Sequence, residues 1–202
     1  MNIKFDPEIH HRNSIRLKGY DYSQVGGYYL TIVTYGRKIL FGDVVGGEIR
    51  VNAMGKIAQE CWSEIPVHFP NVGVDVFTVM PNHVHGILFI YENNPVETNS
   101  FPSVGARTRR GTIYRAPTPK IEQFGKPMAG SLPTVIRTFK ASVTRRAGRE
   151  LNLSTIWQRN YYEHILRDQA DYERIASYIL DNPLAWDQDE ENPLNLQGQR
   201  AT

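Results

Sequence analysis

The pattern of apolar and polar positions divides the chain into strands and helices. Runs of β-branched and aromatic residues predict strands at residues 28–34, 72–79, 83–91 and 156–166. Apolar residues at helical spacing predict helices at about 48–64, 133–149 and 171–182. The order β-α-β-β, a long insertion and then α-β-α predicts an α+β fold, with helices packed on one face of an antiparallel sheet.

This order is that of a ferredoxin-like or RRM-like sheet of about four to five strands. We expect a single domain over residues 28–186, preceded by a polar N-terminal arm at 1–27. An irregular insertion at about 92–131 has no apolar period, and a flexible acidic tail is expected at 187–202.

Two histidines stand at the head of the third predicted strand, in the run Asn82-His83-Val84-His85-Gly86. Side chains at i and i+2 of a strand point to one face, so these imidazoles would project together, about 7 Å apart along the strand. Two imidazoles on one face can bind a divalent metal ion and leave its other positions open. The alternative is a pair of edge-strand histidines that are hydrogen-bonded to neighbours or solvent.

The last predicted helix carries a second pair of chemically useful side chains. Tyr178 and Asn182 are spaced i, i+4, so they lie on one face, and Pro183 ends the helix. A phenol and a carboxamide placed in this way could act as a nucleophile and a third metal ligand. The alternative is a tyrosine that packs on the core and an asparagine that caps the helix.

Composition limits the remaining possibilities. The chain has 202 residues and a formal charge of +2, and no apolar run approaches the roughly 20 residues needed to span a bilayer. The N-terminus lacks the apolar stretch of a signal peptide. The single cysteine, Cys61, excludes an internal disulfide. We therefore expect a cytoplasmic protein without membrane contact.

The small net charge conceals a strongly basic segment. Residues 101–149 hold eleven lysines and arginines but one acid, a net charge of +10 that leaves −8 for the rest of the chain. Such segregation indicates a polyanionic partner. Within the predicted helix at 133–149, Arg137, Lys140 and Arg145 lie away from the apolar stripe and are free to face phosphates.

Three motifs taken together resemble those of a known family. They are Met80-Pro81-Asn82-His83-Val84-His85-Gly86, the run from Trp157 to His164, and Tyr178 followed by Asn182-Pro183. The chain resembles the HUH-type single-tyrosine transposases over about residues 16–186, and within them the REP-associated tyrosine transposases of bacterial chromosomes. The resemblance implies the HUH nuclease fold.

The resemblance also implies a site and a reaction. His83 and His85 would bind Mg²⁺ or Mn²⁺, Asn182 would complete the metal site, and Tyr178 would attack a phosphodiester of single-stranded DNA. The implied product is a 5′-phosphotyrosine and a free 3′-OH, which makes the protein a strand-nicking and joining enzyme. Other tyrosines compete for this role but lack an oxygen ligand at i+4: Tyr161, Tyr162 and Tyr172.

The implied partner is single-stranded DNA with palindromic hairpins, in a nucleoid-associated bacterial protein that acts as a monomer or homodimer. Recognition would fall to the N-terminal arm and the basic helix, with six candidate contacts: Arg16, Lys18, Arg137, Lys140, Arg145 and Arg146. Two alternatives stay open, a hairpin-binding protein without catalysis and a metal-dependent phosphoesterase that uses activated water.

Overall fold

Four antiparallel strands form the central sheet of the computed structural model, which describes residues 20–92, 128 and 130–198. The strand order is β4-β5-β1-β6, so β5, with both histidines, is an inner strand. The strands are β1 (Gly26–Val33), β4 (Val72–Val79), β5 (His83–Ile90) and β6 (Tyr162–Ile165). The predicted α+β class with a four-stranded antiparallel sheet is confirmed.

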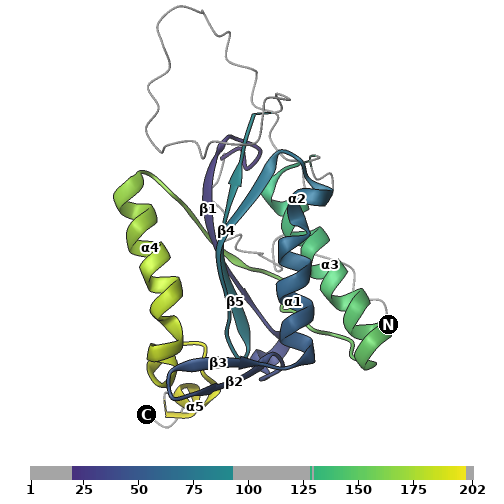
Figure 1. The fold of residues 1–202 in the computed structure, drawn as a ribbon, viewed down its shortest axis with the longest axis vertical. Helices are drawn as coiled ribbons and strands as arrows, with labels where there is room; N and C mark the ends of the chain where they lie inside the picture. The colour runs from purple at the N-terminus through teal and green to yellow at the C-terminus, as the bar shows by residue number, and fades with distance from the viewer. Residues whose placement is uncertain (1–19, 93–127, 129, 199–202) are drawn as a thin grey trace, which may run out of the picture.

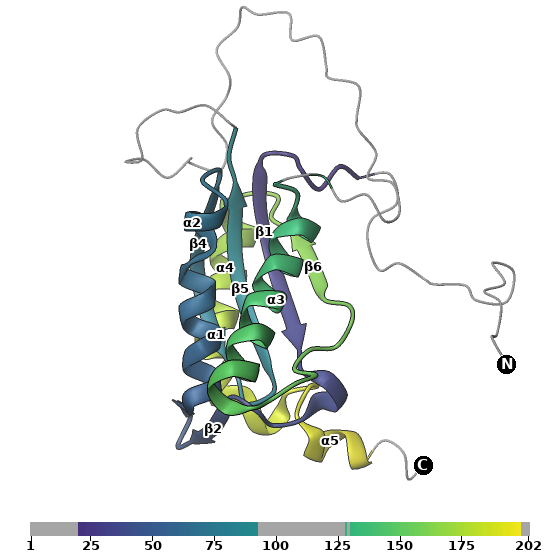
Figure 2. The ribbon, with the colours of Figure 1, turned by 90° about the vertical axis from the view of Figure 1, so that its right-hand side faces the viewer.

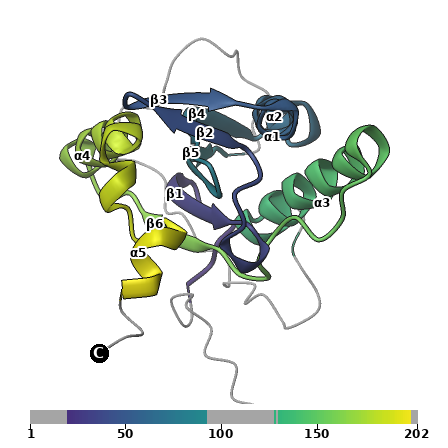
Figure 3. The same cartoon turned by 90° about the horizontal axis from the view of Figure 1, so that it is seen from below.

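Helices cover both faces of this sheet (Figures 1 and 3). On one face lie α1 (Ala53–Ser63), the short α2 (Ile65–His68) and α3 (Leu132–Leu151), and on the other lies α4 (Gln169–Asp181). The expectation that helices pack on one face is therefore wrong. Every residue of β5 is buried, because apolar side chains at alternate positions pack against helices on opposite sides.

The alternation of β1 and β5 separates two cores. Tyr28, Leu30 and Leu88 point toward α1 and α3 and join the larger core, which includes Trp62 and Phe139. On the opposite face, the smaller core contains Tyr29, Ile87, Phe89, Leu166, Ile175 and Ile179. His85 lies on this second face, so α4 packs on the same side of the sheet as the histidine pair.

A second, two-stranded sheet takes the place of the first four residues of the predicted helix at 48–64. β2 (Gly42–Val45) pairs with β3 (Glu48–Val51) across Gly46 and Gly47, whose φ angles of 62° and 79° suit a tight turn. The helix itself, α1, begins only after Asn52, whose side chain accepts a 3.0 Å hydrogen bond from the Gly55 amide. The fourth predicted strand is also shorter, because 156–166 contributes only β6 and an isolated bridge between Thr34 and Trp157.

The chain after α4 returns to the sheet. It forms the 3₁₀ helix η2 (Asn182–Gln188), which contacts β3, and then α5 (Pro193–Gly198). Both lie at the same end of the molecule as β2 and β3 (Figures 1 and 2). Up to residue 198, the segment expected to be a flexible tail is thus folded against the domain. The arm residues 1–19 and most of the insertion lie outside the described residues.

None of the helices in the described ranges combines the length and apolar character needed to cross a bilayer.

Candidate active site

The two histidines of β5 point at the same spot. Their side chains are 0% and 3% exposed, and the Nε2 atoms of His83 and His85 lie 2.9 Å apart. Their ring centroids are 4.5 Å apart. The prediction from the i, i+2 spacing, that the imidazoles share one face, is confirmed.

Asn82 fixes the orientation of His83. Its side-chain amide donates to the carbonyl oxygens of Glu191, at 2.6 Å, and Arg37, at 3.2 Å. These two bonds fix the orientation of the amide group, so that Asn82 Oδ1 faces His83. This oxygen accepts a hydrogen bond from His83 Nδ1 at 2.9 Å. With its proton on Nδ1, neutral His83 directs the lone pair of Nε2 toward His85.

His85 is held by two hydroxyl groups from the neighbouring strand. Its Nδ1 lies 2.8 Å from the Tyr29 hydroxyl and 3.0 Å from Thr31 Oγ1, because Thr31 is its partner in the β1–β5 register. Without a cation, His85 Nε2–H can donate to His83 Nε2. With the proton on Nδ1 instead, both Nε2 lone pairs face one point, which is the arrangement of two metal ligands.

Both imidazoles are neutral at physiological pH. Burial lowers the pKa of His83 well below its usual value, and the neighbouring His85 lowers it further. Burial alone lowers the pKa of His85. Neutral imidazole is the form that binds metals, so protons do not compete with a cation for this pair near pH 7.

A carboxylate that the sequence analysis did not identify completes a cluster of three side chains that could hold a metal ion. Asp189 Oδ2 lies 3.9 Å from His83 Nε2, and one ligand atom from each of His83, His85 and Asp189 lies within 4.8 Å of the other two. Asp189 comes from the segment that was expected to be a free tail. Its role could not be inferred from spacing, because the chain returns to the histidines only through η2.

Asn182, the predicted third ligand, lies at the C-terminal end of α4 as expected. It is 2% exposed, and its Oδ1 is buried without a hydrogen-bond partner among the described residues. A buried amide oxygen in this condition suits coordination of a cation. Imidazole, carboxylate and amide oxygen are all ligand types that fit a divalent metal ion.

Tyr178 extends from α4 toward the histidines. Its ring centroid lies 5.4 Å from that of His85 and 6.3 Å from that of Tyr29, and 48% of the side chain is exposed. Partial burial raises the pKa of Tyr178 and the charge of Asp189 raises it further, while hydrogen bonds from Asn182 and Tyr29 act in the opposite direction. A nearby cation would favour the phenolate.

The competing tyrosines are placed differently. The Tyr172 hydroxyl donates to Asp75 Oδ2 at 2.8 Å, away from the histidine pair. Tyr161 lies under the Lys140 ammonium, 5.8 Å from it. Tyr162 is exposed on β6, with its ring 6.2 Å from that of Tyr29, and is therefore the competitor that remains near the site.

The predicted DNA-contact residues divide into free and engaged groups. Arg137 and Arg145 are exposed on α3 and contact only hydroxyl groups of that helix among the described residues. Lys140 instead donates to the carbonyl oxygens of Gln158 and Asn160, at 2.8 and 2.9 Å. Helical periodicity predicted that Lys140 lies away from the apolar stripe and is free to face phosphates. In the structure, residues 158–160 cover its ammonium group.

Arg146 is also engaged, since it contacts Glu60 at 2.6 Å and Glu150 at 2.9 Å. The remaining two candidates, Arg16 and Lys18, lie outside the described residues. The lysines and arginines of the insertion likewise lie outside the residues that the structure describes.

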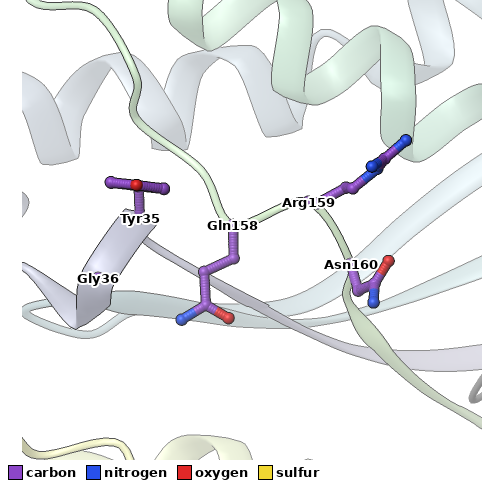
Figure 4. Close-up of a pocket in the computed structure, with 5 residues that line it drawn as sticks. All are labelled: Tyr35, Gly36, Gln158, Arg159 and Asn160. Atoms are coloured by element: carbon purple, nitrogen blue, oxygen red, sulfur yellow. The ribbon is translucent and has the colours of Figure 1, made fainter. Parts of the chain in front are cut away.

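An open pocket of about 490 Å³ lies where β1 ends, and five residues line it: Tyr35, Gly36, Gln158, Arg159 and Asn160 (Figure 4). Val33, the last residue of β1, pairs with His83, so the pocket lies at the same end of the sheet as the histidine pair. The Tyr35 ring is 54% exposed. An exposed aromatic ring beside amide and guanidinium groups is suited to contact an unpaired nucleotide.

Comparison with known proteins places this geometry in a wider context. No protein-family model matches the chain. A protein of Haemophilus influenzae, described as uncharacterized, is 38% identical over 190 residues, which cover 94% of this chain and 98% of that protein.

A solved structure of a REP-associated tyrosine transposase bound to a REP hairpin has a TM-score of 0.51 at 17% identity, covering 86% of this chain and 73% of that one. The resemblance of the sequence motifs to tyrosine transposases is thereby confirmed at the level of the fold. The chain belongs to the same protein family as the Haemophilus influenzae relative, and its architecture is that of the REP-associated tyrosine transposase.

Proposed function

We propose that the protein is a metal-dependent endonuclease and strand transferase that acts on hairpin-bearing single-stranded DNA. The observation that carries the proposal is the placement of a half-exposed phenol, Tyr178, beside a buried pair of neutral imidazoles. The tyrosine is accessible to a large substrate, whereas the histidines are shielded. This combination suits covalent attack on a backbone phosphate.

Four residues would hold the cation: His83, His85, Asp189 and Asn182. When bound, a divalent cation stabilises the negative charge that develops on the phosphoryl oxygens. Mg²⁺ and Mn²⁺ suit the oxygen ligands, and the imidazoles shift the preference toward Mn²⁺. Asn82, Tyr29 and Thr31 keep the two rings in register with the ligand set.

Tyr178 supplies the nucleophile. Its oxygen forms a bond to phosphorus while the bond from phosphorus to the 3′-oxygen breaks, giving a 5′-phosphotyrosine and a 3′-hydroxyl. The phenolic proton passes to solvent, which reaches this side chain, and the departing 3′-oxygen takes up a proton. Since the phosphodiester is exchanged for a phosphotyrosine ester, attack by a 3′-hydroxyl reverses the step and joins strands.

The DNA strand would contact surfaces that the structure leaves free. Arg137 and Arg145 on α3 can pair with phosphates, and the pocket around Tyr35 and Arg159 can receive an unpaired base. Lys140 and Arg146 have intramolecular partners. We therefore assign them a role in stabilising the fold rather than in contacting DNA phosphates.

The test incubates the full-length protein with Mn²⁺ and single-stranded oligonucleotides that carry palindromic hairpins from the gene's own flanks. A denaturing gel should show a protein–DNA conjugate that Tyr178→Phe does not form and Tyr172→Phe does. Binding without cleavage across several metals would favour a hairpin-binding protein. Turnover without a conjugate, unchanged in Tyr178→Phe, would favour a phosphoesterase.

A further inference from the structure

The segment after α4 is attached to the metal-site end of the sheet by a small set of polar contacts. Arg37 Nε donates to Glu191 Oε2 at 2.6 Å, and Asn82 Nδ2 donates to the Glu191 carbonyl oxygen at 2.6 Å. The Glu191 amide in turn donates to Asp189 Oδ1, also at 2.6 Å. We name these four residues, Arg37, Asn82, Asp189 and Glu191, the C-terminal clasp.

The clasp determines which oxygen of Asp189 faces the histidines. Oδ1 is occupied by the Glu191 amide, which leaves Oδ2 as the atom 3.9 Å from His83 Nε2. Asn82 contacts both sides, because its Oδ1 accepts from His83 Nδ1 while its Nδ2 holds the Glu191 backbone. A single amide therefore sets both the direction of His83 and the position of the carboxylate.

The Asp189 carboxyl group is largely buried beside the histidine pair. Its side chain is 6% exposed, and its Oδ2 lies 3.9 Å from His83 Nε2. A buried carboxylate without a compensating charge is costly, and a bound cation would remove that cost. The geometry thus places a buried carboxylate oxygen beside the two imidazole ligand atoms.

We propose that Arg37 and Glu191 are positioning residues that hold Asp189 as an anionic ligand of the metal site. Docking of residues 187–195 and binding of the cation are then thermodynamically linked. A cation that binds Asp189 stabilises the docked segment, and a docked segment raises the affinity for the cation by the same factor. The proposal rests on the metal site of the proposed function, but it does not require any DNA chemistry.

The alternative is that the Arg37–Glu191 ion pair only stabilises the fold. A measurement of metal binding separates the two, because a structural ion pair far from the site should not change it. Arg146 and Glu60 form such a pair, also at 2.6 Å, between α3 and α1. Glu60→Gln is therefore the matched control for Glu191→Gln.

The experiment titrates metal-free, full-length protein with Mn²⁺ and follows the free-ion signal by electron paramagnetic resonance. We expect Glu191→Gln to weaken Mn²⁺ binding by about tenfold to a hundredfold, Asp189→Asn to weaken it at least as much, and Glu60→Gln to leave it unchanged. Hydrogen exchange gives an independent readout. Mn²⁺ should slow amide exchange in residues 187–195 of the wild type but not of Asp189→Asn.

The outcomes separate the clasp from the catalytic proposal. Wild-type Mn²⁺ affinity in Glu191→Gln and Asp189→Asn would overturn the clasp, even if the wild type still forms the DNA conjugate. Clasp-dependent Mn²⁺ binding without any conjugate would instead overturn the catalytic proposal alone. Failure of the wild type to bind Mn²⁺ would remove both.

Discussion

The ring of Tyr178 on α4 meets the ring of His85 on β5 at 65°, with 5.4 Å between their centroids. Two features hold α4 in this position. Ile175 and Ile179 are buried in the smaller core, and Thr78 of β4 donates to the Ile179 carbonyl oxygen at 3.2 Å. The phenol is therefore fixed over the inner strand by neighbouring positions of its own helix, because Ile175 lies on the same face as Tyr178 at a spacing of three residues.

Removing the phenolic oxygen of Tyr178 should abolish the covalent product without unfolding the protein. We expect Tyr178→Phe to reduce conjugate formation at least about a hundredfold, because the nucleophile itself is lost. The free energy of unfolding should change by less than about 0.5 kcal/mol, since the side chain is half exposed. Quantified denaturing gels and urea titration measure the two effects.

Tyr162→Phe is the control for this prediction, because Tyr162 is similarly exposed and also packs near Tyr29. It should retain the conjugate. Loss of the conjugate in Tyr162→Phe together with its persistence in Tyr178→Phe would reassign the nucleophile to β6.

Acidification should destabilise the metal-free protein below about pH 6.5. Burial lowers the pKa of both histidines in the folded state, so the unfolded chain binds protons there that the folded chain does not. Each imidazole then removes up to about 1.4 kcal/mol of stability per pH unit as the pH falls below its unfolded pKa. Above pH 7 this contribution is constant.

The measurement compares urea unfolding at pH 7 and pH 5 for the wild type and His85→Gln. Burial raises the pKa of Asp189, which works in the opposite direction, so the difference between the two proteins isolates the histidine. We expect a steeper loss in the wild type. Equal pH dependence in the two proteins would show that His85 is not buried as a neutral ring.

Two cations of α3 should give opposite phenotypes. Lys140→Met removes a donor from the carbonyl oxygens of Gln158 and Asn160, and we expect a loss of about 1–3 kcal/mol in the free energy of unfolding. Arg145→Met removes an exposed charge, so stability should change by less than about 0.5 kcal/mol. The DNA affinity of Arg145→Met should fall, and the slope of log affinity against log salt concentration should decrease in magnitude by about one.

Fluorescence anisotropy with a labelled hairpin at several salt concentrations measures the binding, and thermal unfolding measures the stability. An Arg145→Met protein that binds DNA with an unchanged salt dependence would exclude this face of α3 from the interface.

Gly86 should tolerate no side chain, because β5 approaches α1 closely at that residue. A Cβ atom at Gly86 would lie 2.5 Å from Cζ2 of the buried Trp62 ring, which is itself stacked on Phe77. We expect Gly86→Ala to cost about 1–3 kcal/mol by overpacking. Gly148 in α3 is exposed, so Gly148→Ala should instead stabilise by about 0.5–1 kcal/mol.

Thermal unfolding of the two glycine variants under identical conditions makes the comparison. Similar changes in both would mean that the Trp62 ring can move away from the strand.

The elements with a strong apolar period could be predicted from the sequence. The strands β4 and β5 and the helices α3 and α4 lie where the pattern placed them, because each buries a continuous apolar face. The β2–β3 hairpin was missed, although residues 48–51 alternate polar and apolar positions. The two glycines before them indicated a break in the chain, and the alternation was assigned to the following helix.

The sequence predicted those parts of the candidate site that depend on the spacing of residues within one strand or one helix. The spacing of His83 and His85, and of Tyr178 and Asn182, sets their shared faces, and α4 crosses the histidine face as expected. Asp189 and the engagement of Lys140 depend on contacts between distant segments. Neither the Arg37–Glu191 ion pair nor the packing of 158–160 on α3 has a periodic signature in the sequence.

The strict alternation of β5 has a consequence for genetics. Odd positions at the start of the strand carry the imidazoles, while even positions, such as Val84 and Leu88, belong to the larger core. Substitutions at residues 83–86 should therefore separate into two kinds of allele by residue parity. One kind would yield abundant but inactive protein, and the other would lower the amount of protein that accumulates in the cell.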